Sequence, residues 1–212
     1  MDANFWHRKW EANEIGFHIS TANPLLVRHI GQLALATGSR LFLPLCGKTL
    51  DIGWLLAQGY QVAGAELSEL AVQQLFAELG VVPVISQHGA LKCYQTGNLQ
   101  VWVGDIFAVS AEQLGRVDAV YDRAALVALP DPVRPRYTAH LREIIAQAPQ
   151  LLVCYAYDQS VQPGPPFSIN QAEVLHHYAE YYDISLLESV EVVGGMKGKC
   201  AAWEHVFHLA KR

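Results

Sequence analysis

The chain contains 212 residues, of which 51% are hydrophobic and 17% are charged, a composition that suits one globular domain with a full core. Fifteen Lys and Arg residues against twenty Asp and Glu residues give a formal net charge of −5, which excludes the basic field that attracts nucleic acid. The N-terminus is polar and no apolar stretch approaches the roughly 20 residues that cross a bilayer, so we expect a cytoplasmic protein with no membrane partner.

The N-terminal residues 1–36 carry apolar side chains at helical spacing and precede the first strand-like segment. Trp6 and Trp10 lie one helical turn apart, so both rings can project from one face of a helix. We therefore expect a single domain over residues 1–212, with residues 1–36 as a helical lid.

From residue 40 onward, strand-like segments alternate with helix-like segments. The expected strands are 41–46, 61–66, 99–103, 117–121 and 151–155, and the expected helices are 50–58, 69–79, 133–147 and 171–181. This alternation predicts a mostly parallel sheet with helices on both faces. Residues 81–98 interrupt it and could form a loop or a hairpin, whereas the long runs 184–193 and 201–209 predict an antiparallel hairpin.

The first expected strand leads into a turn that contains Leu45 and Gly47, and the second ends in Glu66, roughly 20 residues after the glycine. A carboxylate at this point of a βαβ unit can accept hydrogen bonds from both hydroxyls of a ribose. The turn lacks the glycine fingerprint of dinucleotide sites, and Phe42 stands where a P-loop needs glycine. An adenosine ligand without phosphate remains, and S-adenosylmethionine is the candidate. The alternative for Leu45 and Gly47 is an ordinary strand-to-helix turn without a ligand, and the alternative for Glu66 is a solvated surface side chain.

Five sequence blocks occur together and in order along the chain. They are Trp6 and Trp10 with Gly16-Phe17-His18, Leu43-Pro44-Leu45-Cys46-Gly47-Lys48, Gly64-Ala65-Glu66-Leu67-Ser68-Glu69-Leu70, Asp122-Arg123-Ala124-Ala125-Leu126-Val127-Ala128 and Pro163-Gly164-Pro165-Pro166-Phe167. In this combination the chain resembles the thiopurine S-methyltransferase family in its short bacterial form, over nearly its whole length. The resemblance implies an α/β class I methyltransferase (Rossmann-like) fold, with a mostly parallel sheet and a C-terminal antiparallel hairpin.

The resemblance also implies an activity. The enzyme would transfer the methyl group of S-adenosylmethionine to the thiol of a small aromatic or heterocyclic molecule, thiopurines included, and would act as a monomer. Bacterial relatives are linked to methylation of selenium and tellurium compounds, so tellurium resistance is a further expectation. The alternatives are a methyltransferase for another small nucleophile and a non-catalytic domain that binds S-adenosylmethionine. The missing glycine fingerprint disfavours a nicotinamide oxidoreductase.

For the cofactor, the resemblance points to Trp10 in the lid, the turn 45–47, Glu66 and Arg123. Asp105 and Ile106, which follow the third expected strand, would border the adenine. The alternatives are a hydrophobic anchor for the tryptophans of the first helix and a place in the core for Ile106.

The resemblance implies that Arg123 and Asp122 are catalytic, because the matching arginine of the family lies close to cofactor and acceptor. A fixed guanidinium would favour the thiolate form of an acceptor and align it for attack, and Asp122 would fix the guanidinium or the loop. A surface ion pair between the two residues is the alternative. Phe17, Pro166 and Phe167 would form apolar walls for a planar acceptor, although an ordinary proline loop is also possible.

The histidines and cysteines predict no metal centre. Nine histidines are scattered without an i, i+4 pair, and four cysteines form no C-x-x-C pair, so we expect free thiols in a reducing compartment. The family has an arginine near the substrate in the last hairpin loop. Lys197 and Lys199 occupy that stretch here, and the sequence leaves open which of them takes its place.

Overall fold

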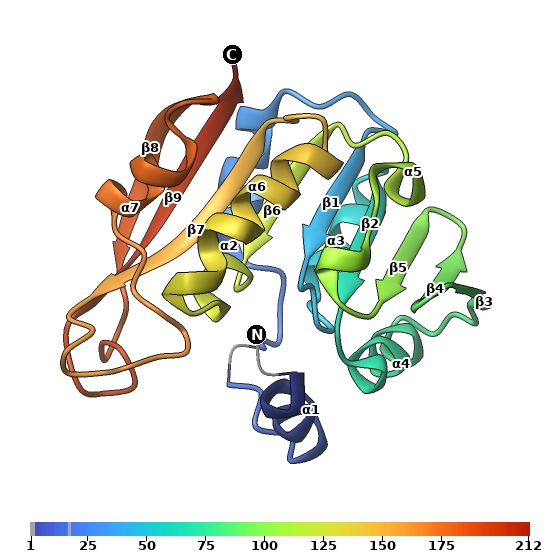
Figure 1. Cartoon of the computed structure of the whole chain (residues 1–212), viewed down its shortest axis with the longest axis horizontal. Helices are drawn as coiled ribbons and strands as arrows, with labels where there is room; N and C mark the ends of the chain where they lie inside the picture. Colours follow the sequence, from blue (N-terminus) through green and yellow to red (C-terminus); the bar gives the residue numbers. More distant parts are fainter. Residues whose placement is uncertain (1–2, 17) are drawn as a thin grey trace.

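The computed structural model describes residues 3–16 and 18–212, which form one nine-stranded sheet surrounded by helices (Figure 1). The strands are β1 (Arg40–Pro44), β2 (Gln61–Glu66), β3 (Val84–His88), β4 (Leu91–Thr96), β5 (Leu99–Val103), β6 (Ala119–Arg123), β7 (Gln150–Tyr157), β8 (Tyr182–Glu191) and β9 (Ala202–Lys211). The helices are α1 (Ala3–Glu11), α2 (Pro24–His29), α3 (Asp51–Ala57), α4 (Glu69–Glu78), α5 (Ala111–Leu114), α6 (Arg134–Ile144) and α7 (Gln171–Tyr178), with short 3-10 turns η1 (Ile30–Leu33), η2 (Ile106–Ala108), η3 (Leu126–Ala128) and η4 (Asp131–Val133). Within these residues no helix has both the length and the apolar character needed to cross a membrane.

The sheet has the strand order β3-β4-β5-β2-β1-β6-β7-β9-β8. Its five central strands, from β5 to β7, pair in parallel, so their carboxyl ends meet at one edge of the sheet. The β3–β4 hairpin and the β8–β9 hairpin extend the two sides with antiparallel pairs. The predicted fold class and the C-terminal hairpin are confirmed, and the stretch 81–98, where the sequence admits a loop or a hairpin, contains a hairpin.

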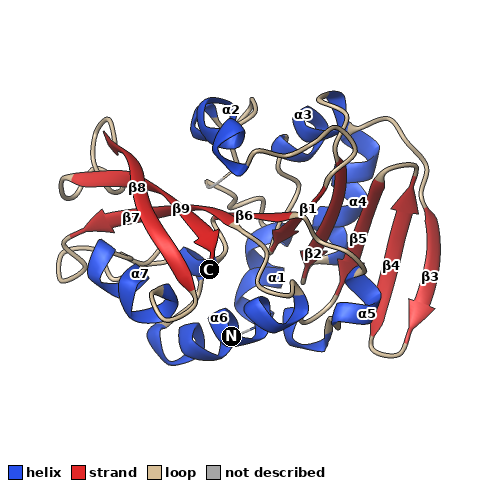
Figure 2. Ribbon diagram, turned by 90° about the horizontal axis from the view of Figure 1, so that it is seen from above, coloured by secondary structure: helices blue, strands red, loops and turns tan. Residues whose placement is uncertain are grey.

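Two hydrophobic cores lie on opposite faces of the sheet, because successive residues of a strand point to opposite faces. Leu26 of α2, Ile52 of α3 and Phe76 of α4 belong to one core. Tyr137 of α6 and Tyr178 of α7 belong to the other. Figure 2 shows the same division, with α2, α3 and α4 along one side of the strands and α5, α6 and α7 along the other.

The N-terminal region, expected to be one helical lid over residues 1–36, divides into two parts. In α1 the only buried side chain is that of Trp10, and Figure 1 shows this helix beyond the ends of the central strands. In α2, by contrast, Leu26 is fully buried against the sheet, and the Asn23 side chain caps the first turn by accepting a hydrogen bond from the Leu25 amide at 2.8 Å. Apolar burial thus makes α2 part of the core, and α1 alone is the candidate lid.

The different burial of two adjacent residues in α2 gives a test of this division. Leu26→Ala should lower the free energy of unfolding by roughly 2 to 5 kcal/mol, because a fully buried side chain is removed and a cavity remains. Val27→Ala should cost less than about 1 kcal/mol, since Val27 is 45% exposed. Urea unfolding of both variants measures the difference. Equal, small effects would place α2 with the lid instead.

Candidate active site

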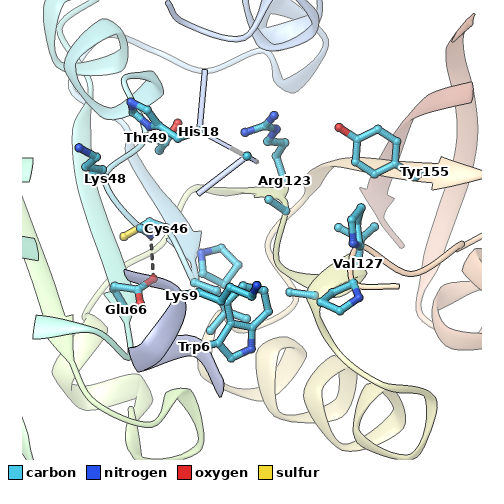
Figure 3. A pocket seen from close by; sticks show the side chains of 18 of the residues that line it. Trp6, Lys9, His18, Cys46, Lys48, Thr49, Glu66, Arg123, Val127 and Tyr155 are labelled. Carbon is cyan, nitrogen blue, oxygen red and sulfur yellow. Dashed lines mark hydrogen bonds between the residues drawn. The ribbon is translucent and has the colours of Figure 1, made fainter. Parts of the chain in front are cut away.

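A cavity of about 580 Å³ lies at the edge where the central strands end, the place where open α/β sheets bind ligands. Side chains reach it from α1, from the segments that follow β1, β2, β6 and β7, and from the loop between β8 and β9. Figure 3 shows Glu66 on one side of the cavity, Tyr155 on the other and Arg123 between them. The site therefore combines residues that are far apart in the sequence.

The turn after β1 forms the floor of the cavity. The strand ends at Pro44, two residues before the predicted end, because Leu45 adopts a left-handed conformation with φ 47° and Gly47 does so again with φ 53°. A Cβ atom on Gly47 would lie only 2.9 Å from Cζ2 of Trp10. The glycine thus lets the indole ring of α1 pack directly on the turn, where Trp10 is 5% exposed.

Glu66 ends β2 and its carboxylate is buried beside this turn. Its Oε2 accepts a hydrogen bond from the Gly47 amide and its Oε1 accepts one from the Ser68 amide, each at 2.8 Å. Burial raises the pKa of Glu66, and these backbone donors oppose that shift. Each carboxylate oxygen has a second lone pair, so both can still accept a hydrogen bond from a ligand hydroxyl.

Asp122 is not at the cavity, which corrects the expectation that it acts beside Arg123. Side chains alternate along β6, so Tyr121 and Arg123 line the cavity while Asp122 points into the opposite core and is fully buried. Its carboxylate accepts hydrogen bonds from the Tyr137 hydroxyl at 2.7 Å and from the Leu126 amide at 3.1 Å. The structure supports the other expected role, since the Leu126 bond holds the loop after β6.

Arg123 lies at the cavity with Tyr155, a residue that the sequence analysis missed. Tyr155 on β7 pairs with Glu204 on β9. Burial and the neighbouring Glu204 raise the pKa of Tyr155 to about 12, whereas the Arg123 guanidinium opposes the shift and shares a hydrogen bond with the phenol. The next residue, Ala124, has φ 63°, an uncommon value for a residue with a side chain. The chain therefore turns directly after Arg123.

The proline loop and the last hairpin loop meet at the cavity. Pro165 and Pro166 line it, as does Lys197, whose Nζ donates a hydrogen bond to the Pro165 carbonyl at 2.9 Å. Lys199 is not among the lining residues. Phe167 does not line the cavity either, because its ring packs against Gly164 and under the Arg134 guanidinium, 5.2 Å from the ring centre.

Two further expected residues, Asp105 and Ile106, are not among the residues that line the cavity. Asp105 is exposed and caps η2 by accepting a hydrogen bond from the Phe107 amide at 3.1 Å. Ile106 is 1% exposed within the hydrophobic core, which was its alternative assignment. Phe17 lies outside the described residues. Within the described part of the chain, no three His, Cys, Asp or Glu side chains are grouped as metal ligands.

Several lining residues were not assigned a role from the sequence, among them His18, Lys48, Asp51, Tyr121 and Tyr155. Asp51 begins α3 and is fully buried, and Tyr121 is 2% exposed on β6. Alternation along β6 could have indicated Tyr121, since it shares a face with Arg123. No local pattern indicates Tyr155, because its position depends on the pairing of β6 with β7.

Known proteins with a similar sequence are methyltransferases by name. The family model described as thiopurine S-methyltransferase (TPMT) matches residues 1–211. The thiopurine S-methyltransferase of Xanthobacter autotrophicus is 50% identical over 212 residues, which is 100% of both chains. That of Teredinibacter turnerae is 49% identical over 211 residues and covers 100% of this chain and 98% of its own.

Solved structures with the same fold are more distant in sequence. A methyltransferase from Anabaena variabilis, named as dependent on S-adenosylmethionine (SAM), has a TM-score of 0.63 at 13% identity and covers 99% of this chain and 95% of its own. The N-terminal domain of EvdMO1, solved with SAH bound, has a TM-score of 0.60 at 16% identity and covers 100% and 98%. These similarities establish a shared fold.

The buried position of Asp122 predicts an unusual pH dependence of stability. Burial raises its pKa to about 6, against hydrogen bonds from Leu126 and Tyr137 that lower it. Because an unfolded aspartate has a pKa of about 3.9, the folded protein binds this proton more tightly. The resulting stabilisation is complete below about pH 4 and is lost as the pH rises through about 6.

The substitution Asp122→Asn should remove this contribution. Relative to the wild type, the variant should gain up to roughly 3 kcal/mol of unfolding free energy between about pH 4 and pH 7, since the amide stays neutral. Urea unfolding of both proteins at several pH values measures the gain. Two parallel stability curves would contradict a raised pKa for Asp122.

Proposed function

The chain belongs to the thiopurine S-methyltransferase family, and we propose that its cavity binds S-adenosylmethionine against Trp10 and Glu66 and the acceptor against Arg123 and Tyr155. The protein is a methyltransferase that uses S-adenosylmethionine to methylate sulfur in a small molecule. The observation that carries the site assignment is the glycine turn, which has the Trp10 ring packed on it and donates its Gly47 amide to the buried Glu66 carboxylate.

The residues at the turn fit the chemical parts of this cofactor. Glu66 offers free lone pairs on both oxygens, which suits the two adjacent hydroxyls of a ribose. The Trp10 ring, held over the turn, could attract a sulfonium cation by about 0.5 to 2 kcal/mol. The turn has no second glycine to wrap a pyrophosphate, and the cofactor has no phosphate. Bound in this way, S-adenosylmethionine supplies an electrophilic methyl group on its sulfur.

The acceptor side of the site supplies orientation and charge. Arg123 and Lys197 are both cations at the cavity, and Pro165 and Pro166 provide an apolar wall on which a planar heterocycle can stack. The Arg123 guanidinium favours the thiolate form of an acceptor. Tyr155, which interacts with both Arg123 and Glu204, orients that guanidinium. Aromatic thiols ionise readily, so alignment and exclusion of water are the main contributions of these residues.

The same reasoning defines the range of acceptors and the role of α1. Selenium and tellurium nucleophiles are soft and polarisable like a thiolate, so we include them in the proposed range. We also propose that α1 acts as the lid, because it contributes Phe5, Trp6, Lys9 and Trp10 to the cavity and buries only Trp10. We also propose that the protein is a monomer in the cytoplasm and does not bind nucleic acid. The four free cysteines support a reducing compartment, and the net charge of −5 disfavours nucleic acid as a partner.

The ribose assignment predicts a loss of ligand discrimination in Glu66→Gln. The wild type should bind 5′-methylthioadenosine at least roughly 10-fold more tightly than its 2′-deoxy analogue, because the analogue lacks the hydroxyl that donates a charge-assisted hydrogen bond to Glu66. In Glu66→Gln the ratio of the two affinities should fall toward one, measured by calorimetry. Glu69→Gln is the control, since Glu69 pairs with Lys92 outside the main cavity. A variant ratio equal to that of the wild type would sink the assignment.

The role of Arg123 predicts how the rate depends on pH. Arg123→Ala should lower kcat/KM for an aromatic thiol by roughly 10- to 100-fold, and Arg123→Lys by less, because the charge remains without the planar donors. The midpoint of kcat/KM against pH should follow the pKa of the thiol when a second thiol is used. Arg116→Ala is the control, because Arg116 is exposed and does not line the cavity.

The contrary outcome identifies a different mechanism. A midpoint that stays fixed when the thiol is exchanged would mean that an enzyme group titrates, and the titratable groups near Arg123 are His18, Tyr121, Tyr155 and Glu204. Binding of S-adenosylhomocysteine without methyl transfer to any thiol or selenol would favour the non-catalytic alternative. Transfer to oxygen or nitrogen acceptors alone would favour another small nucleophile.

A further inference from the structure

One end of the cavity holds a buried carboxylate that the proposed roles do not use. Asp51, at the start of α3, is fully buried and lines the cavity. Its Oδ1 accepts a hydrogen bond from the Asn23 amide at 2.6 Å, but its Oδ2 has no partner of normal hydrogen-bond geometry among the described residues, with the Tyr121 hydroxyl as its polar neighbour. An unsatisfied oxygen of a buried carboxylate costs free energy, so it marks a place where a ligand donor fits.

The Tyr121 hydroxyl lies beside this carboxylate and likewise lacks a partner of normal hydrogen-bond geometry among the described residues. The residue is buried on β6. Burial, followed by the charge of Asp51, raises its pKa well above the usual value, so the two groups are neighbours and the phenol stays protonated. His18 also lines the cavity, where burial and then the charge of Lys48 lower its pKa, with smaller effects from Glu78, Arg123 and Asp51.

The cavity therefore has three polar ends, grouped around the turn after β1. Glu66 is the first, at the end of β2, and Arg123 with Tyr155 is the second, beyond β6. Asp51 with Tyr121 is the third, on the side of the sheet that α2 and α3 cover, and it adjoins the second, because the charge of Arg123 also acts on Tyr121. A sulfonium sulfur likewise has three substituents, namely the adenosyl group, the methyl group and the aminobutyrate chain.

We infer that Asp51 binds the α-ammonium group of the cofactor's aminobutyrate chain, and that the Tyr121 hydroxyl donates a hydrogen bond to the α-carboxylate group of the same chain. This inference rests on the proposed cofactor site and extends it to the one substituent that Glu66 and Arg123 leave unassigned. The chemistry matches, because an ammonium group has only donors and Asp51 Oδ2 is an acceptor. A charge-assisted hydrogen bond would offset the burial of the carboxylate.

Calorimetry with three ligands tests the inference on the wild-type protein. The ligands are S-adenosylhomocysteine, its desamino analogue and 5′-methylthioadenosine, which lacks the whole amino-acid part. S-adenosylhomocysteine should bind roughly 10- to 100-fold more tightly than the desamino analogue, because only the former donates to Asp51. Equal affinity of these two ligands would overturn the inference. Binding of 5′-methylthioadenosine tests the adenosine site by itself, so the two proposals can fail separately.

The substitution Asp51→Asn adds a second measurement, because its remaining oxygen can still accept the Asn23 amide. The variant should lose about the same factor for S-adenosylhomocysteine and should bind 5′-methylthioadenosine and the desamino analogue within about twofold of the wild type. Its stability without ligand should be unchanged or higher, since a buried charge is removed. Tyr121→Phe should weaken S-adenosylhomocysteine but not 5′-methylthioadenosine. An equal loss for all three ligands in Asp51→Asn would show that the carboxylate only shapes the turn.

Discussion

The Glu66 carboxylate joins the turns on which the whole cavity is built. It accepts one hydrogen bond from an amide of the turn after β1 and one from an amide at the start of α4. The backbone carbonyl of Glu66 also accepts a hydrogen bond from the Gly104 amide at 2.9 Å. The ends of β1, β2 and β5 are thereby tied together at one residue. Because backbone donors already hold the carboxylate in place, a ligand hydroxyl meets an acceptor that needs no rearrangement, which is the condition for tight and selective binding.

The turn after β1 depends on this anchor, since it contains two left-handed residues. Leu45 takes φ 47°, which costs free energy for a residue with a side chain, and such strain persists where the surroundings hold it. The Gly47 amide donates a hydrogen bond to the Glu66 carboxylate, and the Cys46 amide donates one to the Ala65 carbonyl at 3.0 Å. The turn thus places its backbone at the cavity, and the absence of a side chain on Gly47 leaves room for the Trp10 ring.

Side chains alternate along β6, so residues that line the cavity and a residue that stabilises the core lie on the same strand. Tyr121 and Arg123 face the cavity, while Asp122 lies between them on the other face and bonds to Tyr137 of α6. The Leu126 amide, also bound by Asp122, fixes the loop that returns the chain toward the core. A core hydrogen-bond network therefore holds the strand and loop on either side of Arg123, although Asp122 does not line the cavity.

The sequence alone determined the five central strands, the antiparallel C-terminal hairpin and the glycine turn with Glu66, because these depend on local periodicity and on spacing within one βαβ unit. It misplaced Asp122, Ile106 and Phe167 relative to the cavity, since neighbours in a motif share a sequence block but not a direction. Only the tertiary structure brought Tyr155, Lys197 and Asp51 to one cavity. The reason is physical: strand pairing and packing of helices on opposite faces join segments that no local pattern connects.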